Sequence, residues 1–297
     1  MTSLIASLTA SLASSLTAGV GLKPDHYAEA LACDAPGLWF EVHPENYMVD
    51  GGPRLAWLER MRAERPLSLH SVAMSLAAPD APDPDILDRL ASLVRRYDPA
   101  LVSGHLAWNG WRGHYLPDLL PVARTDESLD CIVANLGRVQ DRLQRQVAIE
   151  NPSHYLAFDD HRIGEVEFLT TIAARSGCAL LVDINNVFVS ARNLGFDAGA
   201  WIDSVPAALV SELHLAGHAE DPLLGAALLV DSHDAPVCAG VWSLYQRLVE
   251  RIGPRPTLIE RDGNLPAFET LLDEREQAHR VLHACAARPD RPLQVAA

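Results

Sequence analysis

Histidines and carboxylates recur in this sequence at the points where short apolar runs end. The segment ELHLAGH, residues 212–218, alternates apolar and polar residues as a strand does, and it ends on two histidines, His214 and His218. The segment DSHD follows at 231–234. Imidazole and carboxylate groups together suit iron, zinc or manganese. The pattern therefore predicts a metal centre, without naming the metal.

The same pattern appears at nearly every apolar run of the chain. The donors are Glu41, Glu45, Asn46, His70, His105, Glu150, Asn151, Asp183, Asn185, Asn186, His214, His218, Glu260 and Asp262, with Asp231, His233 and Asp234 in a long connection. Taken singly, His70 or His105 is more often a hydrogen-bonded core residue than a ligand. Placed together, so many charges need cations as partners. They are too many for one ion, so we expect two or three ions bridged by a carboxylate such as Glu150.

Short apolar runs alternate with longer amphipathic segments, which predicts parallel strands joined by helices. The expected strands are 19–22, 38–42, 67–70, 101–106, 146–151, 179–185, 210–217 and 256–262. The expected helices are 83–96, 126–144, 165–176, 199–208, 241–252 and 267–285, the second capped by Thr125. Eight such strands predict an α/β fold, a (β/α)₈ TIM barrel. A doubly wound open sheet is the alternative, but the chain has no GxGxxG fingerprint.

The barrel brings the donors together, because the active site of such a fold lies at the carboxyl ends of its strands. We expect polar groups from seven of the eight strands to meet at one mouth. Six histidines lack this placement, and we expect them on the surface or on helices: His26, His114, His154, His161, His279 and His283.

Composition limits the partners of the chain. The net charge of −15 over 297 residues argues against a nucleic-acid binder, which needs clustered Lys and Arg. The five cysteines are scattered and form no CxxC pair, which is consistent with a reducing cytoplasm. The sequence contains no run of eighteen apolar residues, so we expect no membrane span.

The predicted organisation is a weakly ordered extension over 1–18, a single domain over 19–285 and a polar tail over 286–297. The Ala-, Ser- and Leu-rich extension could be a secretory signal. It has no basic residue before Lys23, and Ser and Thr interrupt its apolar residues. Both features favour an extension over a signal.

A series of long motifs carries a more specific indication. In chain order they are GVGLKP, WFEVHPENYM, GGP, PLSLHSVAMSL, HLAWN, DLLPV, ENPSHYL, EFL, LLVDINNVFVSARNLGF, ELHLAGH, DSHDAPV and PTLIERD. Together they resemble the MbnB/TglH-type multinuclear non-haem iron oxidase family of methanobactin-type peptide biosynthesis, over about residues 19–280. The family fold is a xylose-isomerase-like barrel.

The resemblance implies three neighbouring metal positions. By this resemblance, the ligands of the first position are Glu150, Asp183, His214 and Glu260. Those of the second are His70 and His105, with Glu150 as a bridge to the first. Those of the third are Asn186, His218, Asp231 and His233. Glu150 and Asp262 are the implied catalytic residues, and Asn46 and Asn151 are implied neighbours of the metals. This chain departs from the family pattern at Gly104, where the family usually has Glu, and at Arg261, where most members have Trp. Its HSVAMS replaces the usual HGVGLS.

The implied activity is oxidation of cysteine in a ribosomally made precursor peptide by dioxygen, with two or three mixed-valent Fe(II)/Fe(III) ions as cofactor. The products of the family include thiooxazole and oxazolone–thioamide groups. A small partner protein that delivers the peptide is also implied. Two other functions stay open: a metal-dependent isomerase or phosphodiesterase of the same barrel superfamily, and a non-catalytic metal-bound peptide carrier.

Overall fold

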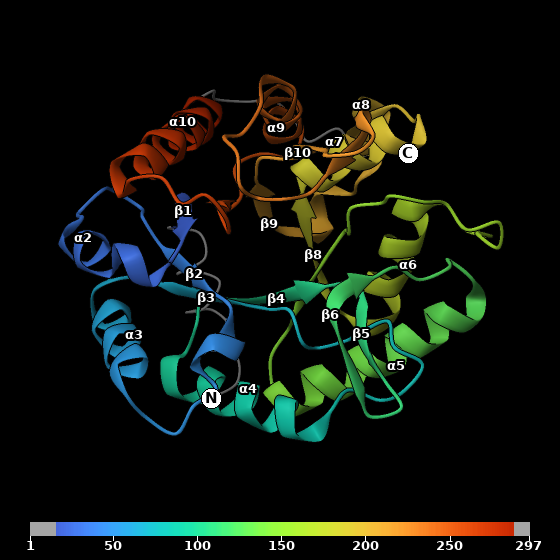
Figure 1. Cartoon of the computed structure of the whole chain (residues 1–297), viewed down its shortest axis with the longest axis horizontal. Helices are drawn as coiled ribbons and strands as arrows, with labels where there is room; N and C mark the ends of the chain where they lie inside the picture. The colour runs from blue at the N-terminus through green and yellow to red at the C-terminus, as the bar shows by residue number, and fades with distance from the viewer. Residues whose placement is uncertain (1–15, 288–297) are drawn as a thin grey trace.

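Eight parallel strands close into a barrel in the computed structural model, which describes residues 16–287 (Figure 1). In chain order they are β1 (Ala18–Gly21), β2 (Phe40–Val42), β3 (Leu67–Ser71), β4 (Leu101–His105), β7 (Ala148–Glu150), β8 (Ala179–Asp183), β9 (Val210–Leu215) and β12 (Thr257–Ile259). Each strand pairs with its neighbours in this order, and β12 closes the barrel on β1. The predicted barrel and its eight strands are confirmed, although most strands are shorter than expected.

Helices surround the barrel. They are α2 (Tyr27–Ala32), α3 (Pro53–Glu64), α4 (Pro84–Tyr97), α5 (Asp126–Leu143), α6 (Glu165–Ser176), α7 (Ile184–Leu194), α8 (Ala198–Ser204), α9 (Ala239–Ile252) and α10 (Phe268–Ala286). Thr125 caps α5 as predicted, since its side chain accepts from Ser128 N while the Ser128 hydroxyl accepts from Thr125 N. The helix expected over 199–208 ends earlier, at Ser204, because Pro206 cannot continue it.

One helix replaces part of an expected strand. We expected the strand of ALLVDIN to reach residue 185, but α7 begins directly after Asp183. The Asp183 carboxylate accepts a hydrogen bond from Asn186 N at 2.7 Å, which caps the helix. Asn185 and Asn186 therefore lie in the first turn of a helix above the barrel mouth, and not in a strand. Helices α2 and α3 were also not predicted.

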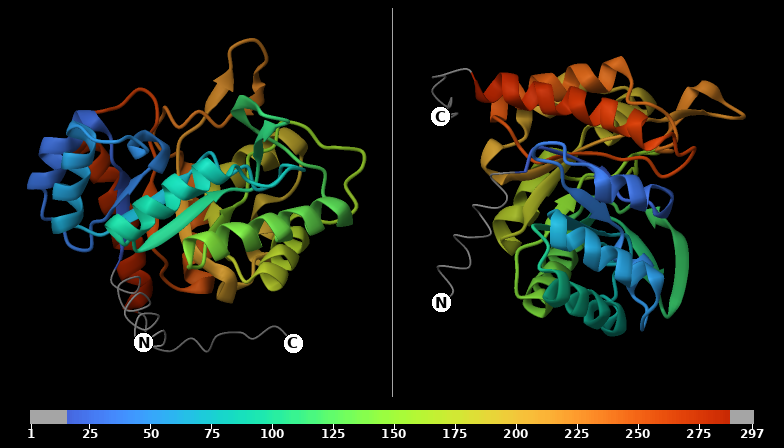
Figure 2. Two further views of the ribbon diagram at one scale, coloured as in Figure 1. Left: turned by 90° about the horizontal axis from the view of Figure 1, so that it is seen from below. Right: turned by 90° about the vertical axis from the view of Figure 1, so that its left-hand side faces the viewer.

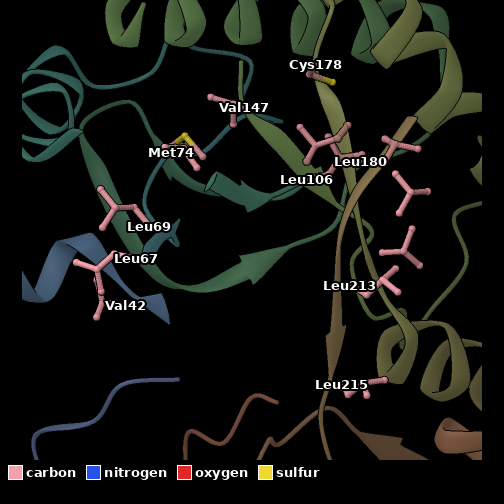
Figure 3. Close-up of a cluster of buried hydrophobic side chains, with 14 of the residues drawn as sticks. Val42, Leu67, Leu69, Met74, Leu106, Val147, Cys178, Leu180, Leu213 and Leu215 are labelled. Atoms are coloured by element: carbon pink, nitrogen blue, oxygen red, sulfur yellow. The ribbon is translucent and has the colours of Figure 1, made fainter. Parts of the chain in front are cut away.

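Strands β3 and β9 separate apolar from polar side chains by simple alternation. In β3, Leu67 and Leu69 are buried in the hydrophobic core, and Leu213 and Leu215 do the same in β9 (Figure 3). The residues between and beside them, such as His70 and His214, lie on the other face of the strand, toward the barrel axis. All of these side chains are buried, so the barrel interior is polar at this level.

Two antiparallel hairpins, absent from the sequence prediction, interrupt the connections after β4 and β9. The first consists of β5 (Trp108–Trp111) and β6 (His114–Leu120), and the second of β10 (Ala219–Asp221) and β11 (Gly225–Val230). Both project from the same side of the barrel in the left view of Figure 2.

The ends of the domain differ slightly from the prediction. The extension expected over 1–18 lies mostly outside the described residues, but Ala18 begins β1 and Leu16 is buried. The tail expected over 286–297 also lies outside them, apart from residues 286 and 287. Within residues 16–287, the model contains no helix long and apolar enough to cross a membrane.

Candidate metal centre

Six buried donors lie at the carboxyl ends of the barrel strands, as the sequence predicts. His70, His105, Glu150, Asp183 and His214 lie in or at the end of β3, β4, β7, β8 and β9, and Glu260 directly follows β12. Five of these residues are at most 5% exposed, and the His105 side chain is 13% exposed. The fold therefore collects them in one place that is almost closed to water.

His70, His105 and Glu150 form one group of converging atoms. Glu150 Oε2 lies 3.1 Å from His70 Nε2 and 3.3 Å from His105 Nε2, and the two imidazole nitrogens are 3.3 Å apart. Ligands about 2.0–2.2 Å from a common ion lie at roughly this separation from one another. This triangle fits the predicted second metal position.

The orientation of His70 leaves its Nε2 available to a metal. Its Nδ1 lies 2.9 Å from the Ser103 hydroxyl. When Nδ1 donates to Ser103 Oγ, the Nε2 lone pair points at Glu150 and His105.

Another set of donors surrounds a different point, which corresponds to the first of the three predicted metal positions. These donors are Glu150, Asp183, His214 and Glu260. One donor atom from each of Glu150, Asp183 and His214 lies within 4.8 Å of the others, and Asp183 forms a similar group with His233 and Glu260. Glu260 Oε2 lies 3.1 Å from His214 Nδ1 and 3.6 Å from His233 Nδ1. Glu150 therefore belongs to both groups, which supports its predicted role as a bridge.

The predicted third position is less compact. Asp231 Oδ1 lies 2.8 Å from His233 Nε2, so these two ligands meet. His218 is held away from them, because its Nδ1 contacts Asn185 Oδ1 at 2.8 Å and Asn185 Nδ2 donates to Asp231. Groups of three mutually close donors within residues 16–287 do not include His218.

Asn186 contacts the shared carboxylate of Glu150. Its amide Nδ2 donates to Glu150 Oε1 and to the carbonyl of Asn151, both at 3.1 Å. Its Oδ1 is buried and accepts no hydrogen bond in the described part of the chain. Asn186 can therefore both orient the bridging carboxylate and offer an oxygen to a cation.

The remaining predicted residues surround the cluster. Asn151 is buried and exchanges two hydrogen bonds with the Asp183 backbone, at 2.9 and 3.0 Å, which fixes the end of β8. Asp262 contacts His233 Nδ1 at 3.3 Å and forms an ion pair with Lys23. Asn46 lines a cavity of about 180 Å³ beside His43, Glu41 and Glu260.

Sequence reasoning missed several participants. Glu212 is fully buried beside His214, and Glu41, named only as a strand end, also contacts His214. The alternation in ELH, which places Glu212 and His214 on one face of the strand, is the signal that could have identified the former. We expected His154 on the surface or on a helix, but it is buried in the loop after β7, and its Nε2 lies 2.7 Å from Glu165.

Protonation in the cluster is strongly perturbed. Burial raises the pKa of Glu150 to about 8 and, with the nearby Glu150 charge, raises that of Asp183 well above its usual value. Burial lowers the pKa of His70 to about 4. Burial opposes the charge on His214 as well, but the carboxylates of Glu41, Glu212 and Glu260 outweigh it and raise its pKa. Carboxylates and imidazoles therefore compete for protons that a cation would replace.

Unpartnered buried atoms show that these residues fit a metal. Glu150 Oε2, Asp183 Oδ2 and Asn186 Oδ1 are buried without a hydrogen-bond partner among the described residues. Buried polar atoms normally have partners, so a set of unpartnered oxygen atoms in one place fits a bound cation. Nitrogen and oxygen donors without thiolate suit iron, manganese or zinc.

The departures from the family motifs leave the donors in place. A β-carbon at Gly104 would lie 2.1 Å from the Met74 methyl group and 2.7 Å from Ser71 O, so Met74 fills the space beside this glycine. Arg261 is buried, and its guanidinium donates to Glu274 on α10 at 3.0 Å. Neither position is one of the candidate ligands.

Comparison with known proteins decides the family. A family model described as "RiPP precursor modification enzyme MbnB/TglH/ChrH" matches residues 17–283. The chain belongs to this family. RiPPs are ribosomally synthesised and post-translationally modified peptides, so the family modifies precursor peptides. The resemblance identified from the motifs is thereby confirmed.

Curated relatives match over nearly their whole length. A UPF0276 protein of Caulobacter vibrioides is 59% identical over 266 residues, which cover 90% of this chain and 95% of the relative. A UPF0276 protein of Bordetella bronchiseptica is 45% identical over 273 residues, covering 91% and 93%.

Solved structures agree on the fold. A xylose isomerase-like TIM barrel protein from Mycobacterium smegmatis, in complex with magnesium, has a TM-score of 0.61 at 13% identity, covering 93% of this chain and 99% of that one. Endonuclease IV from Thermus thermophilus has a TM-score of 0.52 at 15% identity, covering 91% and 98%. At these identities the likeness shows the barrel architecture alone.

Proposed function

We propose that this protein is an iron- and dioxygen-dependent oxidase that modifies cysteine residues of a ribosomally made precursor peptide. The observation that carries the proposal is the shared Glu150 carboxylate, which belongs both to the His70–His105 group and to the group with Asp183 and His214. A family that modifies precursor peptides provides the substrate class.

Two adjacent ions suit a reaction that must hold two reactants at once. Bound iron would supply Lewis acidity toward a cysteine thiolate and electrons for dioxygen. His70, His105 and Glu150 would hold one ion, and Asp183, His214 and Glu260 the other, with Glu150 shared. The third position, with Asn186, His218, Asp231 and His233, would complete a three-ion site.

The chain's own residues provide positioning and exclusion of water. The six donors at the strand ends are nearly closed to solvent, which strengthens their electrostatic interactions. The 180 Å³ cavity, lined by His43, Asn46 and Glu260, leads from this cluster and is the place for the reacting side chain. Asp262, whose pKa is lowered to about 2 because His233 and Lys23 outweigh the effect of burial, stays ionised and holds both of those groups at the cavity edge.

The surface around the mouth fits a peptide. Three segments follow β4, β7 and β9, and they carry most of the exposed large hydrophobic side chains of residues 16–287: Trp111, Tyr115, Leu119, Tyr155, Leu156, Phe158, Leu223 and Leu224. Contiguous exposed apolar side chains mark interaction sites. We assign this rim to the precursor peptide and to a small partner protein that delivers it.

The test uses iron-loaded protein with the proposed cysteine-containing precursor peptide and the proposed partner protein. Oxygen consumption and peptide mass are measured together. We expect oxygen uptake and a mass change with the native peptide, and neither with the same peptide carrying serine in place of cysteine. Peptide binding without oxygen uptake would instead indicate a carrier. Anaerobic turnover of a sugar or a phosphodiester with divalent metal would indicate the alternative enzymes.

A further inference from the structure

A second layer of polar side chains lies directly beneath the candidate ligands. The residue two positions before a ligand faces the same side of its strand. Ser68 precedes His70, Ser103 precedes His105 and Glu212 precedes His214 in this way. Glu41 of β2 joins them, since its Oε2 accepts from the Ser68 hydroxyl at 2.8 Å. Barrel interiors of this class are usually filled by branched aliphatic residues, so polar groups here need an explanation.

Glu212 is the most unusual member of this layer. Its exposure is 0%, and both carboxylate oxygens lack a hydrogen-bond partner among the described residues. Its ion-pair contact is His214 Nε2, which lies 3.7 Å from Oε1. Burying a carboxylate without a partner is costly, so we attribute the burial of Glu212 to its contact with His214.

Glu41 approaches the same nitrogen from another strand. Its Oε1 lies 3.4 Å from His214 Nε2. The two carboxylates, on β2 and β9, therefore share one imidazole nitrogen, and the separations are those of a shared ion pair. His214 Nδ1 lies 3.1 Å from Glu260 Oε2, a candidate ligand.

The two nitrogens of His214 thus have different surroundings. Nδ1 lies beside Glu260 of the candidate cluster, and Nε2 faces the two carboxylates below. A neutral imidazole that binds a metal through one nitrogen carries its proton on the other. An acceptor for that proton fixes both the tautomer and the ring orientation.

We propose that Glu41 and Glu212 are positioning residues whose negative charges hold the proton of His214 on Nε2, so that Nδ1 is its metal-binding nitrogen. The proposal rests on the proposed iron centre. The Ser103 hydroxyl contacts the Nδ1 atom of His70 in the same way, but it carries no charge. An anionic acceptor makes the imidazole a stronger donor, which favours Fe(III) over Fe(II) at the ion that His214 binds.

The experiment compares Glu212→Gln and Glu212→Ala with wild type. Glu212 is preferable to Glu41 because Glu41 also lines the cavity. Gln keeps an acceptor oxygen at the site but removes the charge, and Ala removes both. Glu165→Gln is the matched control, because Glu165 is a buried carboxylate paired with His154 instead of with the metal cluster. The readouts are iron affinity, measured by competition with a chelator, and the midpoint potential of the bound iron, both without peptide.

We expect Glu212→Ala to weaken iron binding by about 10- to 100-fold and Glu212→Gln to restore most of that loss. The Gln variant should still have a higher midpoint potential. A tenfold loss of preference for Fe(III) corresponds to about 59 mV for one electron. The double variant Glu41→Gln, Glu212→Gln should shift the potential further, and Glu165→Gln should leave it unchanged.

An unchanged potential and iron affinity in both Glu212 variants would overturn the inference. A potential shift of equal size in Glu165→Gln would do the same, since it would reflect general destabilisation. Failure of the proposed function is separable, because these readouts use no peptide. If the wild type binds no iron, the proposed function fails, and Co(II) affinity of the same variants then decides whether the two carboxylates orient His214.

Discussion

His70 Nε2 lies 3.1 Å from Glu150 Oε2, although that oxygen accepts no hydrogen bond within the described part of the chain. When His70 Nδ1 donates to the Ser103 hydroxyl, which it contacts, its Nε2 presents a lone pair. Two lone pairs that converge at this distance repel unless a proton or a cation lies between them. We assign a cation to that place.

Glu150→Gln tests the shared carboxylate. Gln keeps the shape but bridges two cations poorly, and the charge that balances them is lost. We expect loss of the ion held by His70 and His105, partial filling of the site at Asp183, and a fall in peptide oxidation by orders of magnitude. Iron stoichiometry and product mass measure the effect, with far-UV circular dichroism expected to stay unchanged. A fully loaded and active variant would show that another carboxylate is the bridge.

His214→Ala tests the group that His214 forms with Asp183, Glu260 and Glu150. The change removes a candidate ligand beside Glu260, so we expect lower iron occupancy and no turnover. His283→Ala, an exposed histidine on α10, is the control and should keep full iron content. Metal analysis of both purified variants is the measurement. Equal iron loss from the two would mean that the strand-end histidines have no special role.

Glu165→Gln separates stability from chemistry. Glu165 accepts from Trp201 Nε1 at 2.9 Å and contacts His154 Nε2 at 2.7 Å, and this network holds the segment after β7. We expect a loss of about 2 kcal/mol in unfolding free energy at neutral pH. Denaturant unfolding measures it.

The pH dependence of that loss has a definite sign. Burial opposes ionisation of Glu165, but the contacts with His154 and Trp201 outweigh it and lower its pKa. A lowered carboxylate pKa stabilises the fold above the ordinary Glu pKa, and the stabilisation disappears as the pH falls through the lowered value. The difference between wild type and Glu165→Gln should therefore shrink in acid. A difference that grows in acid would contradict this assignment.

Gly104→Ala tests the packing beside His105. The new methyl group would meet Met74 and the Ser71 carbonyl, so we expect a loss of about 1–3 kcal/mol in stability. Gly137→Ala in α5 is the control, because no atom lies within 4 Å of its added β-carbon. That change should stabilise the protein by about 0.5–1 kcal/mol. Thermal unfolding distinguishes the two, and a neutral Gly104→Ala would show that Met74 moves aside freely.

Much of the barrel was predictable because local signals and long-range packing agree in it. Continuous apolar runs such as ALLVD are typical of strands buried on both faces, and Thr125 with Ser128 begins α5 at the expected residue. The two hairpins were missed because they are short and mostly exposed, so neither has an apolar period to detect. The start of α7 was missed because Asp183 is both the last residue of a strand and the cap of a helix.

The candidate site was predictable only in part. Strand-end position identified the residues of the His70 and Asp183 groups, since that position depends on local sequence alone. The contact of His218 with Asn185 depends on how α7 is oriented above the mouth, and no local pattern specifies it. Glu41 and Glu212 both contact His214, although they are 171 residues apart in the sequence (212 − 41 = 171). Such a meeting requires the closed barrel.

The most direct test of the central claim is the metal content of protein isolated without oxygen, by elemental analysis with Mössbauer spectroscopy. We predict two or three iron ions per chain, as a mixture of Fe(II) and Fe(III). A single zinc ion with no iron would contradict it.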